Sequence, residues 1–455
     1  MLVRNSDSDC QTKCNFGDKR LTDRALYIQD HLRVKYGQPL SKVFKNASDL
    51  KRTYEFLANS KTSFQLVTEP SHYQTANLVK NLPIILSVGD TSFLDYKNIK
   101  VKREEYGPTG NGGNGLILHT SLAVDPDCGQ PLGILWEKVW KREKLEKGKK
   151  NKRTRTFYEK ESYKWVEAIK NIPEFLQERK SIKLPKVIHV FDREGDISEV
   201  FEEVQNLEKA GLLVRATHNR SLEDAQNYLW GYVQKQPVQF SFQLDISPHE
   251  TRKKRTGVFE VRFCPVKLRS PDRLKESDGF NVYAVYATEI NVPEGEYPIS
   301  WMLLTTEKVE SISSAKTILR WYSYRWLIEE YHKILKSGCQ VESYRLAGNS
   351  MEVLLGFLTT ISADLLRMTY LHRTQPESPA DEIFTSVQIK VLKAKSLSRK
   401  KPKSVDTIKD AIEAIARLGG YLEHRRKTPI GITVLWRGWL ELMSLCEGWE
   451  LRETF

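Results

Sequence analysis

Five strand-length apolar runs constrain the fold of this chain more than any other feature. The first three follow one another closely, which favours antiparallel pairing, whereas the last two follow segments with helical spacing that can serve as crossovers. The runs lie at 82–88, 115–124, 131–140, 186–191 and 212–217 and are bounded by Gly, Pro or Asp. This order predicts an α/β fold built on a mixed sheet.

The segments after the five runs predict an insertion and further helices. Residues 220–300 alternate apolar and polar side chains in three segments separated by turns, which indicates a β-rich insertion. One more strand is expected at 301–306, followed by long helices at about 313–336 and 350–373. We therefore expect three domains: a helical domain at 1–70, an α/β core at 71–372 and a helical domain at 373–455.

The charge of the chain indicates the kind of partner. The 455 residues include 71 Lys and Arg against 58 Asp and Glu, a net charge of +13, which favours a polyanion. The runs 138–155 (+8) and 390–403 (+7) account for all of this excess, and the remaining residues together carry a net charge of −2. Contacts from these runs to a nucleic-acid backbone should weaken steeply as salt is added.

Composition also excludes several classes of protein. Ten Trp, 19 Tyr and 17 Phe are too many for a disordered chain. No apolar segment reaches the length of a membrane span, and the polar N-terminus lacks the apolar run of a signal peptide. The six cysteines are scattered, as is typical of reduced thiols. We therefore expect a cytoplasmic protein without a membrane partner.

Two acidic residues follow apolar strands directly. Asp90 follows the run 82–88 after one Gly, and Asp192 follows the run 186–191. Ligand sites of open α/β sheets lie at the carboxyl ends of strands, so these positions are candidates for a site. Local sequence leaves a second interpretation open, in which each Asp starts a turn or caps the next helix.

The predicted helix at 322–336 has one face that combines aromatic, basic and acidic residues. At 100° per residue, six side chains fall within an arc of about 100°: Tyr322, Arg325, Trp326, Glu329, Lys333 and Lys336. The opposite face is apolar and is expected to pack on a core. A solvated amphipathic helix is the commoner explanation of such a pattern, but Tyr and Trp have little use on a merely solvated face.

Carboxylates that meet at one point repel one another unless cations join them. Oxygen-rich sites suit Mg²⁺ or Mn²⁺. Two such ions about 3.5–4 Å apart can clamp the attacking and leaving oxygens of a phosphoryl transfer. Arg and Lys beside them would bind the flanking phosphates.

At these residues the sequence resembles the cut-and-paste DDE transposases of insertion-sequence family four. The family motif is Tyr, two residues, Arg, three residues, Glu, six residues, Lys, and it matches Tyr322, Arg325, Glu329 and Lys336. GDTSFLDY supplies the first acid, Asp90, and VFDREGDI the second, Asp192. The resemblance continues through VRATHNR, PISWMLLT, AIARLGGYLE and VLWRGW, and it covers most of the chain from about residue 15.

The resemblance implies an architecture and a chemistry. It implies an RNase H-like core with the insertion placed before the Glu329 helix, an N-terminal domain that recognises transposon ends and a C-terminal domain that pairs protomers. It also implies nicking at the transposon end, a hairpin intermediate, hairpin opening and joining of the 3′-hydroxyl to target DNA. Asp90, Asp192 and Glu329 would carry two Mg²⁺ ions, for which Mn²⁺ can substitute. The partners would be double-stranded DNA and a second protomer, in a bacterial cytoplasm at the nucleoid.

The resemblance further suggests residues that contact DNA. Trp301 stands where the family has a Trp that stacks on a flipped base, although a Trp in a core strand is the plainer interpretation of this residue alone. The other candidates are basic or aromatic residues near the acids: Tyr322, Arg325, Lys333, Lys336, Arg215 and Arg345.

Three functions remain to be distinguished. The first is an active transposase that works as a DNA-bound dimer. The second is a structure-selective RNase H-like nuclease, which would cleave DNA without joining it to a target. The third is a non-catalytic DNA-binding regulator of transposition. All three acids are present together with the basic N-terminal segment, which favours the first function over the third.

Overall fold

The computed structural model describes residues 16–96, 103–110, 112–143, 155–177, 184–223, 227–248, 253–274, 277–398, 402–422 and 430–454. The chain forms two compact units, each built from separate segments. The first comprises Met1–Val79, Thr91–Lys149 and Leu327–Phe455, and the second Lys80–Asp90 and Lys150–Trp326. Much of the basic run 138–155 and residues 399–401 of the run 390–403 lie outside the described residues.

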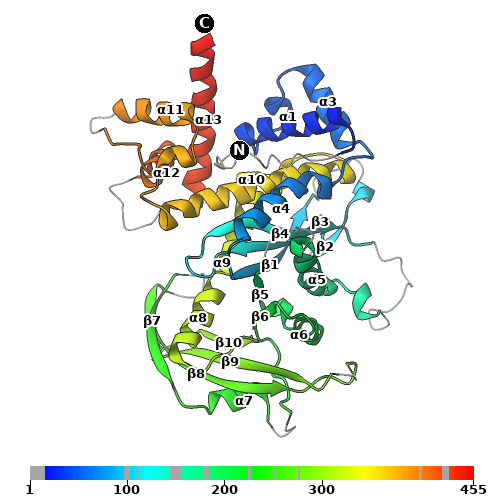
Figure 1. The fold of residues 1–455 in the computed structure, drawn as a ribbon, viewed down its shortest axis with the longest axis vertical. Helices are drawn as coiled ribbons and strands as arrows, with labels where there is room; N and C mark the ends of the chain where they lie inside the picture. The colour runs from blue at the N-terminus through cyan, green and yellow to red at the C-terminus, as the bar shows by residue number, and fades with distance from the viewer. Residues whose placement is uncertain are drawn as a thin grey trace. The chain divides into compact units, whose positions relative to one another are not determined.

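The second unit is built on a mixed sheet (Figure 1). β1 and β5 pair in parallel, as do β5 and β6, and every later pair is antiparallel. In order across the sheet the strands are β1 (Ile84–Asp95, of which the residues up to Asp90 belong here), β5 (Lys186–Phe191), β6 (Ala210–Arg215), β10 (Ser300–Thr305), β9 (Phe280–Ile290), β8 (Arg255–Leu268) and β7 (Phe240–Ile246). The β-rich insertion therefore extends the sheet rather than forming a separate one.

Helices connect the strands of the second unit. The crossovers before β5 and β6 contain α5 (Tyr163–Gln177) and α6 (Ser198–Gln205), and the insertion begins with α7 (Leu229–Gln234). α8 (Ile312–Ser323) follows β10. Trp165 of α5 packs on Phe191 of β5, with their rings 4.6 Å apart, so this crossover is fixed to the strand that ends at Asp192.

The first unit contains the remaining strands. β2 (Gly107–Gly110), β3 (Gly113–Val124) and β4 (Pro131–Trp140) are antiparallel neighbours. The end of β1 lies beside β3, and the two segments run in opposite directions. The Thr91 side chain contacts His119, whereas the amide of Tyr96, later in the chain, donates to the carbonyl of Asn114, which comes before His119. An RNase H-like core has three antiparallel strands followed by two strands parallel to the first. Here the antiparallel strands are β1, β3 and β4, and the strands parallel to β1 are β5 and β6. This confirms the predicted fold class.

The helices of the first unit come from both ends of the chain. α10 buries mostly apolar residues, together with several Ser and Thr, and packs on α4 and β4. The helices are α1 (Lys19–Lys35), α2 (Leu40–Val43), α3 (Ala47–Leu57), α4 (Phe64–Val79), α9 (Trp326–Lys333, from Leu327 on), α10 (Gly348–Thr374), α11 (Ser386–Leu397), α12 (Ile408–Leu418) and α13 (Ile432–Thr454). Among the described residues, no helix combines the length and the apolar character that crossing a membrane requires.

Two details differ from the sequence predictions. β1 does not end near Asp90 but continues to Asp95, because the residues after Asp90 alternate and bury Ser92 and Leu94 beside β3. Asp90 is therefore not a turn residue. The predicted helix 313–336 is interrupted at Tyr324 and Arg325, whose amides bond to the carbonyl groups three residues earlier and tighten the chain.

The interruption changes the predicted helical face. Tyr322 lies in the last turn of α8, Arg325 lies in the turn after it, and Lys336 lies in a π-helical turn (Ile334–Gly338) after α9. The prediction that these six side chains share one arc of a single helix is therefore wrong. The apolar face is confirmed, because all five of its residues are buried: Leu327, Ile328, Tyr331, Ile334 and Leu335.

Candidate active site

The second unit brings Asp90 and Asp192 to the same level of neighbouring strands. The parallel register of β1 and β5 runs to the pair Val88 and Val190, and each acid lies two residues further along its strand. Both residues are partly buried. The sheet thus holds two carboxylates at adjacent strand positions, as the sequence predicted for a ligand site.

Asp192 also caps the short helical turn that follows it. Its Oδ1 accepts a hydrogen bond of 2.8 Å from the Glu194 amide, at the start of the 3₁₀ turn Arg193–Gly195. The capping interpretation of this Asp is therefore correct, but it does not exclude a metal ligand. A carboxylate offers about four acceptor positions, and the cap uses one of them.

Three guanidinium groups and a tyrosine lie near Asp192. Arg215 hydrogen-bonds Tyr322 and also donates to the Ser300 carbonyl at 2.9 Å. Partial burial lowers the pKa of Arg215 from its ordinary value, and the charges of Arg193 and Arg325 act in the same direction. Like charges held together in this way favour an anionic ligand between them.

Tyr322 lies at the centre of this group. Burial is the main reason that the pKa of Tyr322 is raised, and the negative charge of Asp192 raises it further, whereas Arg325 and Arg215 oppose the shift. The phenol is therefore a neutral hydrogen-bond donor at physiological pH. The structure thus brings together Asp192, Arg215, Tyr322 and Arg325, four of the residues that the sequence predicted.

Trp301 lies on β10 of the same unit and is partly buried. Its indole stacks on Phe259 of β8, with ring centroids 5.2 Å apart and planes inclined by 22°. Phe259 is fully buried and stacks in turn on Phe242. One face of the Trp301 ring is thus fixed by an aromatic neighbour, which is an arrangement suited to presenting the rest of the indole to a base.

The first unit carries Glu329 on α9. A buried polar group anchors this helix, because the Tyr331 hydroxyl donates to Glu137 Oε1 of β4 at 2.9 Å. Thr120 of β3 donates to the same oxygen at 3.1 Å. Tyr331 and Glu137 are both buried, so α9 is fixed to β3 and β4 two residues after Glu329.

The three further basic candidates also lie in the first unit. The Lys336 ammonium donates to the Phe93 carbonyl at 2.7 Å and lies 3.9 Å from Glu342, so it is oriented by β1 and the segment after α9. Lys333 is exposed on α9, and Arg345 is exposed just before α10. The structure therefore groups Glu329, Lys333 and Lys336 on one short segment, with Arg345 further along the chain.

The donor set suits a hard cation. Asp90, Asp192 and Glu329 offer only carboxylate oxygens, which Mg²⁺ and Mn²⁺ prefer. Within the residues that the structure describes, no three His, Cys, Asp or Glu side chains already converge as a metal site. Asp90 and Asp192 form the part of such a set that the second unit holds by itself.

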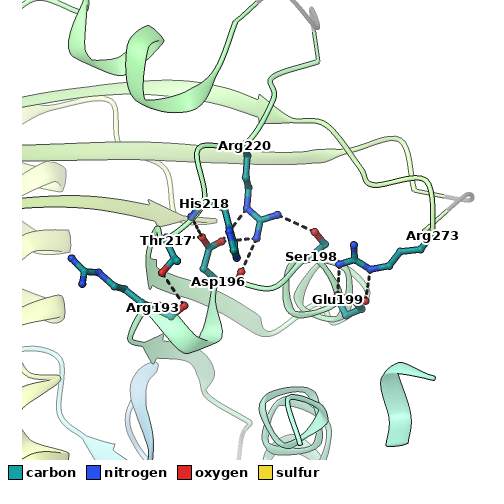
Figure 2. Close-up of polar contacts among 8 residues, drawn as sticks. All are labelled: Arg193, Asp196, Ser198, Glu199, Thr217, His218, Arg220 and Arg273. Atoms are coloured by element: carbon teal, nitrogen blue, oxygen red, sulfur yellow. Dashed lines mark hydrogen bonds and ion pairs between the residues drawn. The ribbon is translucent and has the colours of Figure 1, made fainter. Parts of the chain in front are cut away.

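Two features of this site were not predicted from the sequence. Arg193, directly after Asp192, belongs to the guanidinium group around Tyr322. Asp196 and Arg220 form a buried ion pair at 2.6 Å that joins the segments after β5 and β6 (Figure 2). The signal was present in the motif VFDREGDI, whose second Asp has no reason to be buried in an ordinary turn.

Comparison with protein families agrees with this geometry. The sequence family described as "Transposase DNA-binding" matches residues 8–62. The family described as "Transposase DDE domain" matches residues 36–363, which is most of the chain and includes Asp90, Asp192 and Glu329. Such a domain implies the use of a divalent metal ion and of DNA as partner. With a DDE domain over most of its length and an overlapping DNA-binding match at its N-terminal end, the chain belongs to the DDE transposase family.

Proposed function

We propose that this chain is a cut-and-paste transposase of insertion-sequence family four, close to the transposase of transposon Tn-five. It nicks transposon ends, forms and opens a hairpin, and joins the freed 3′-hydroxyl to target DNA. Glu329 completes the catalytic set with Asp90 and Asp192, which together hold two Mg²⁺ or Mn²⁺ ions. Two protomers act on the paired ends, with residues 1–70 binding the ends and residues 373–455 pairing the protomers.

One observation carries this proposal. Asp90 and Asp192 occupy the same level of neighbouring parallel strands, beside a group of three arginines and a neutral tyrosine. Carboxylates for cations next to donors for phosphate oxygens suit phosphoryl transfer on a nucleic acid, because the reaction needs positioning and charge stabilisation more than covalent chemistry.

The residues have separate roles in this proposal. When bound, two ions supply a clamp on the attacking and leaving oxygens of an in-line displacement. Arg215 and Arg325 bind phosphates that flank the scissile bond, and Tyr322 donates a hydrogen bond to one of them. Lys333, Lys336 and Arg345 extend this contact from the segment that carries Glu329. Trp301 stacks on the base that leaves the helix when the hairpin bends.

Product analysis separates transposition from simple cleavage. The purified chain is incubated with Mg²⁺ and with DNA that carries the ends of its own element, either intact or already cut to expose the 3′-hydroxyl. We expect hairpins from intact ends and joining of pre-cut ends to a target plasmid. Cleavage without joining would favour the structure-selective nuclease. End binding without any metal-dependent reaction would favour the non-catalytic regulator.

Replacing Trp301 with Ala is expected to slow hairpin formation by about 5- to 150-fold, because a base stacked on an aromatic ring contributes roughly 1–3 kcal/mol. Nicking precedes base flipping and should keep its rate. The measurement is the rate of each step on the same labelled end. Tyr297→Ala removes an exposed aromatic residue four positions earlier and serves as the control. Equal slowing of nicking and hairpin formation would contradict a stacking role.

A further inference from the structure

Asp196 has a buried carboxylate whose acceptor positions are occupied by the chain itself. Its side chain is fully inaccessible, four residues after Asp192. Oδ2 accepts from the amides of Thr217 at 2.7 Å and His218 at 3.0 Å, just beyond β6. Oδ1 accepts from Arg220 Nε at 3.0 Å and Nη2 at 2.6 Å (Figure 2).

Arg220 makes contacts beyond this ion pair. Its Nη2 also donates to the Asp196 carbonyl at 2.7 Å, and its Nη1 donates to the Ser198 hydroxyl at 3.0 Å. Thr217 donates from its hydroxyl to the Arg193 carbonyl at 3.2 Å. These bonds join the segment after β5, which begins with Asp192, to the segment after β6, which begins beyond Arg215. We call the pair Asp196 and Arg220 the β5–β6 clamp.

Besides the β5–β6 clamp, side-chain contacts of Asp192, Thr217 and Lys164 also hold the turn that follows Asp192. It consists of the 3₁₀ turn Arg193–Gly195, and turns this short have few hydrogen bonds of their own. Gly195 lies so close to β5 that a Cβ atom there would approach the Phe191 side chain to 2.6 Å. The turn is thus pressed against the strand at one end and fixed by Asp196 at the other.

We propose that the β5–β6 clamp is a positioning device that fixes the Asp192 carboxylate and the Arg215 guanidinium relative to one another. The inference rests on the proposed function, in which Asp192 holds a metal ion and Arg215 binds a phosphate. A buried ion pair is a costly way to stabilise a fold, because both charges lose their hydration. The β5–β6 clamp acts here by fixing positions. Residues that orient metal ligands act in the same way, and their loss typically lowers metal affinity or activity by about 10- to 100-fold.

The test compares the β5–β6 clamp with a nearby ion pair that is more exposed. Asp196→Asn keeps the shape of the side chain but removes the charge that Arg220 requires. Arg220→Lys keeps the charge and loses the paired bonds, so it is the milder variant if Asp196→Asn folds poorly. Arg273→Ala is the control, because Arg273 forms a two-bond pair with Glu199 of α6 at 2.8 and 3.1 Å that does not involve the turn (Figure 2).

Four measurements are made on each full-length variant. Hydrogen exchange, followed by mass spectrometry, should rise in peptides covering 192–198 and 216–220 for both clamp variants but not for Arg273→Ala. Mn²⁺ binding, followed by electron paramagnetic resonance, should weaken by about 10-fold or more for Asp196→Asn. The Mg²⁺ concentration at half-maximal cleavage should rise to a similar extent, and most of the rate should return at high Mg²⁺, while end binding is unchanged.

The outcomes are distinct from those that test the proposed function. A merely structural role would lower the fraction of active protein without shifting the Mg²⁺ midpoint or the Mn²⁺ affinity, and that result would overturn the proposal. Unchanged exchange at 192–198 in both clamp variants would overturn it as well. Failure of the proposed function would appear instead as an Asp192→Asn variant that retains both Mn²⁺ binding and cleavage.

Discussion

Replacing Glu329 with Ala is expected to lower the cleavage of transposon ends by at least about a thousand-fold and to leave end binding nearly unchanged. A bound metal pair contributes several kcal/mol to the stabilisation of the transition state, and each 1.36 kcal/mol changes a rate about tenfold. Asp192→Ala should behave alike, because both residues are proposed ligands. The measurements are single-turnover cleavage of a labelled end and its dissociation constant.

A neighbouring acid provides the matched control for Glu329. Glu330 lies on the same helix and accepts a hydrogen bond of 2.6 Å from Tyr370. Glu330→Gln keeps an acceptor for Tyr370 and removes the charge, so cleavage should stay within a few-fold of wild type. Near-normal cleavage by Glu329→Ala, or an equal loss in Glu330→Gln, would refute the assignment of Glu329 as a metal ligand.

The sequence predicted the strands of the core well because each carries its own local pattern. The predicted strands 186–191 and 131–140 have the same first and last residues as β5 and β4. Both are short, mostly apolar segments, and the first lies between Pro185 and Asp192, which favour the ends of strands. Their pairing also followed from connection length, since only helical crossovers can return the chain to a parallel neighbour.

The sequence failed where tertiary contacts decide the structure. Asp90 lies within β1 because β3 offers a partner to the residues after it, and no local pattern reveals that partner. The break between α8 and α9 at Tyr324 and Arg325 has no Gly or Pro to announce it. Helical periodicity therefore predicted one continuous helix across this turn, although it identified the buried face of α9 correctly.

The candidate site was partly predictable for a similar reason. Motif spacing identified Tyr322 and Arg325, and strand ends identified Asp192. Neither signal identified Arg193 or the β5–β6 clamp. Their roles depend on the segments after β5 and β6, which meet only in the folded chain. The assignment of domains at 1–70, 71–372 and 373–455 stays a prediction, and so does the meeting of Glu329 with the two aspartates.

Replacing the buried His189 with Leu is expected to make the protein markedly less sensitive to acid. His189 lies in the middle of β5 between Ser87 and Leu212 of the neighbouring strands and is fully buried. Neither ring nitrogen has a hydrogen-bond partner among the described residues. Burial lowers the pKa of His189 to about 3, because the charged imidazolium would lose its hydration there.

The sign of the pH effect follows from proton binding. The unfolded chain takes up a proton at His189 near pH 6.5, whereas the folded chain does so only near pH 3. Between these values the unfolded state binds more protons, so the free energy of unfolding falls by about 1.4 kcal/mol for each unit that the pH drops. At pH 4.5 this single group therefore costs the wild type about 3 kcal/mol relative to neutral pH.

The His189→Leu variant should lose this part of the pH dependence. Leu has a similar volume and brings no buried polar atom, so the variant should be at least as stable as wild type at pH 7.5. Thermal unfolding midpoints measured from pH 7.5 to 4.5 should diverge, with the wild type falling faster. His332, whose pKa burial also lowers to about 3, acts in both proteins, so the difference between the two curves isolates His189. The exposed His218 provides the control His218→Leu, whose curve should parallel wild type. Parallel curves for His189→Leu would mean that His189 is hydrated or partnered in solution.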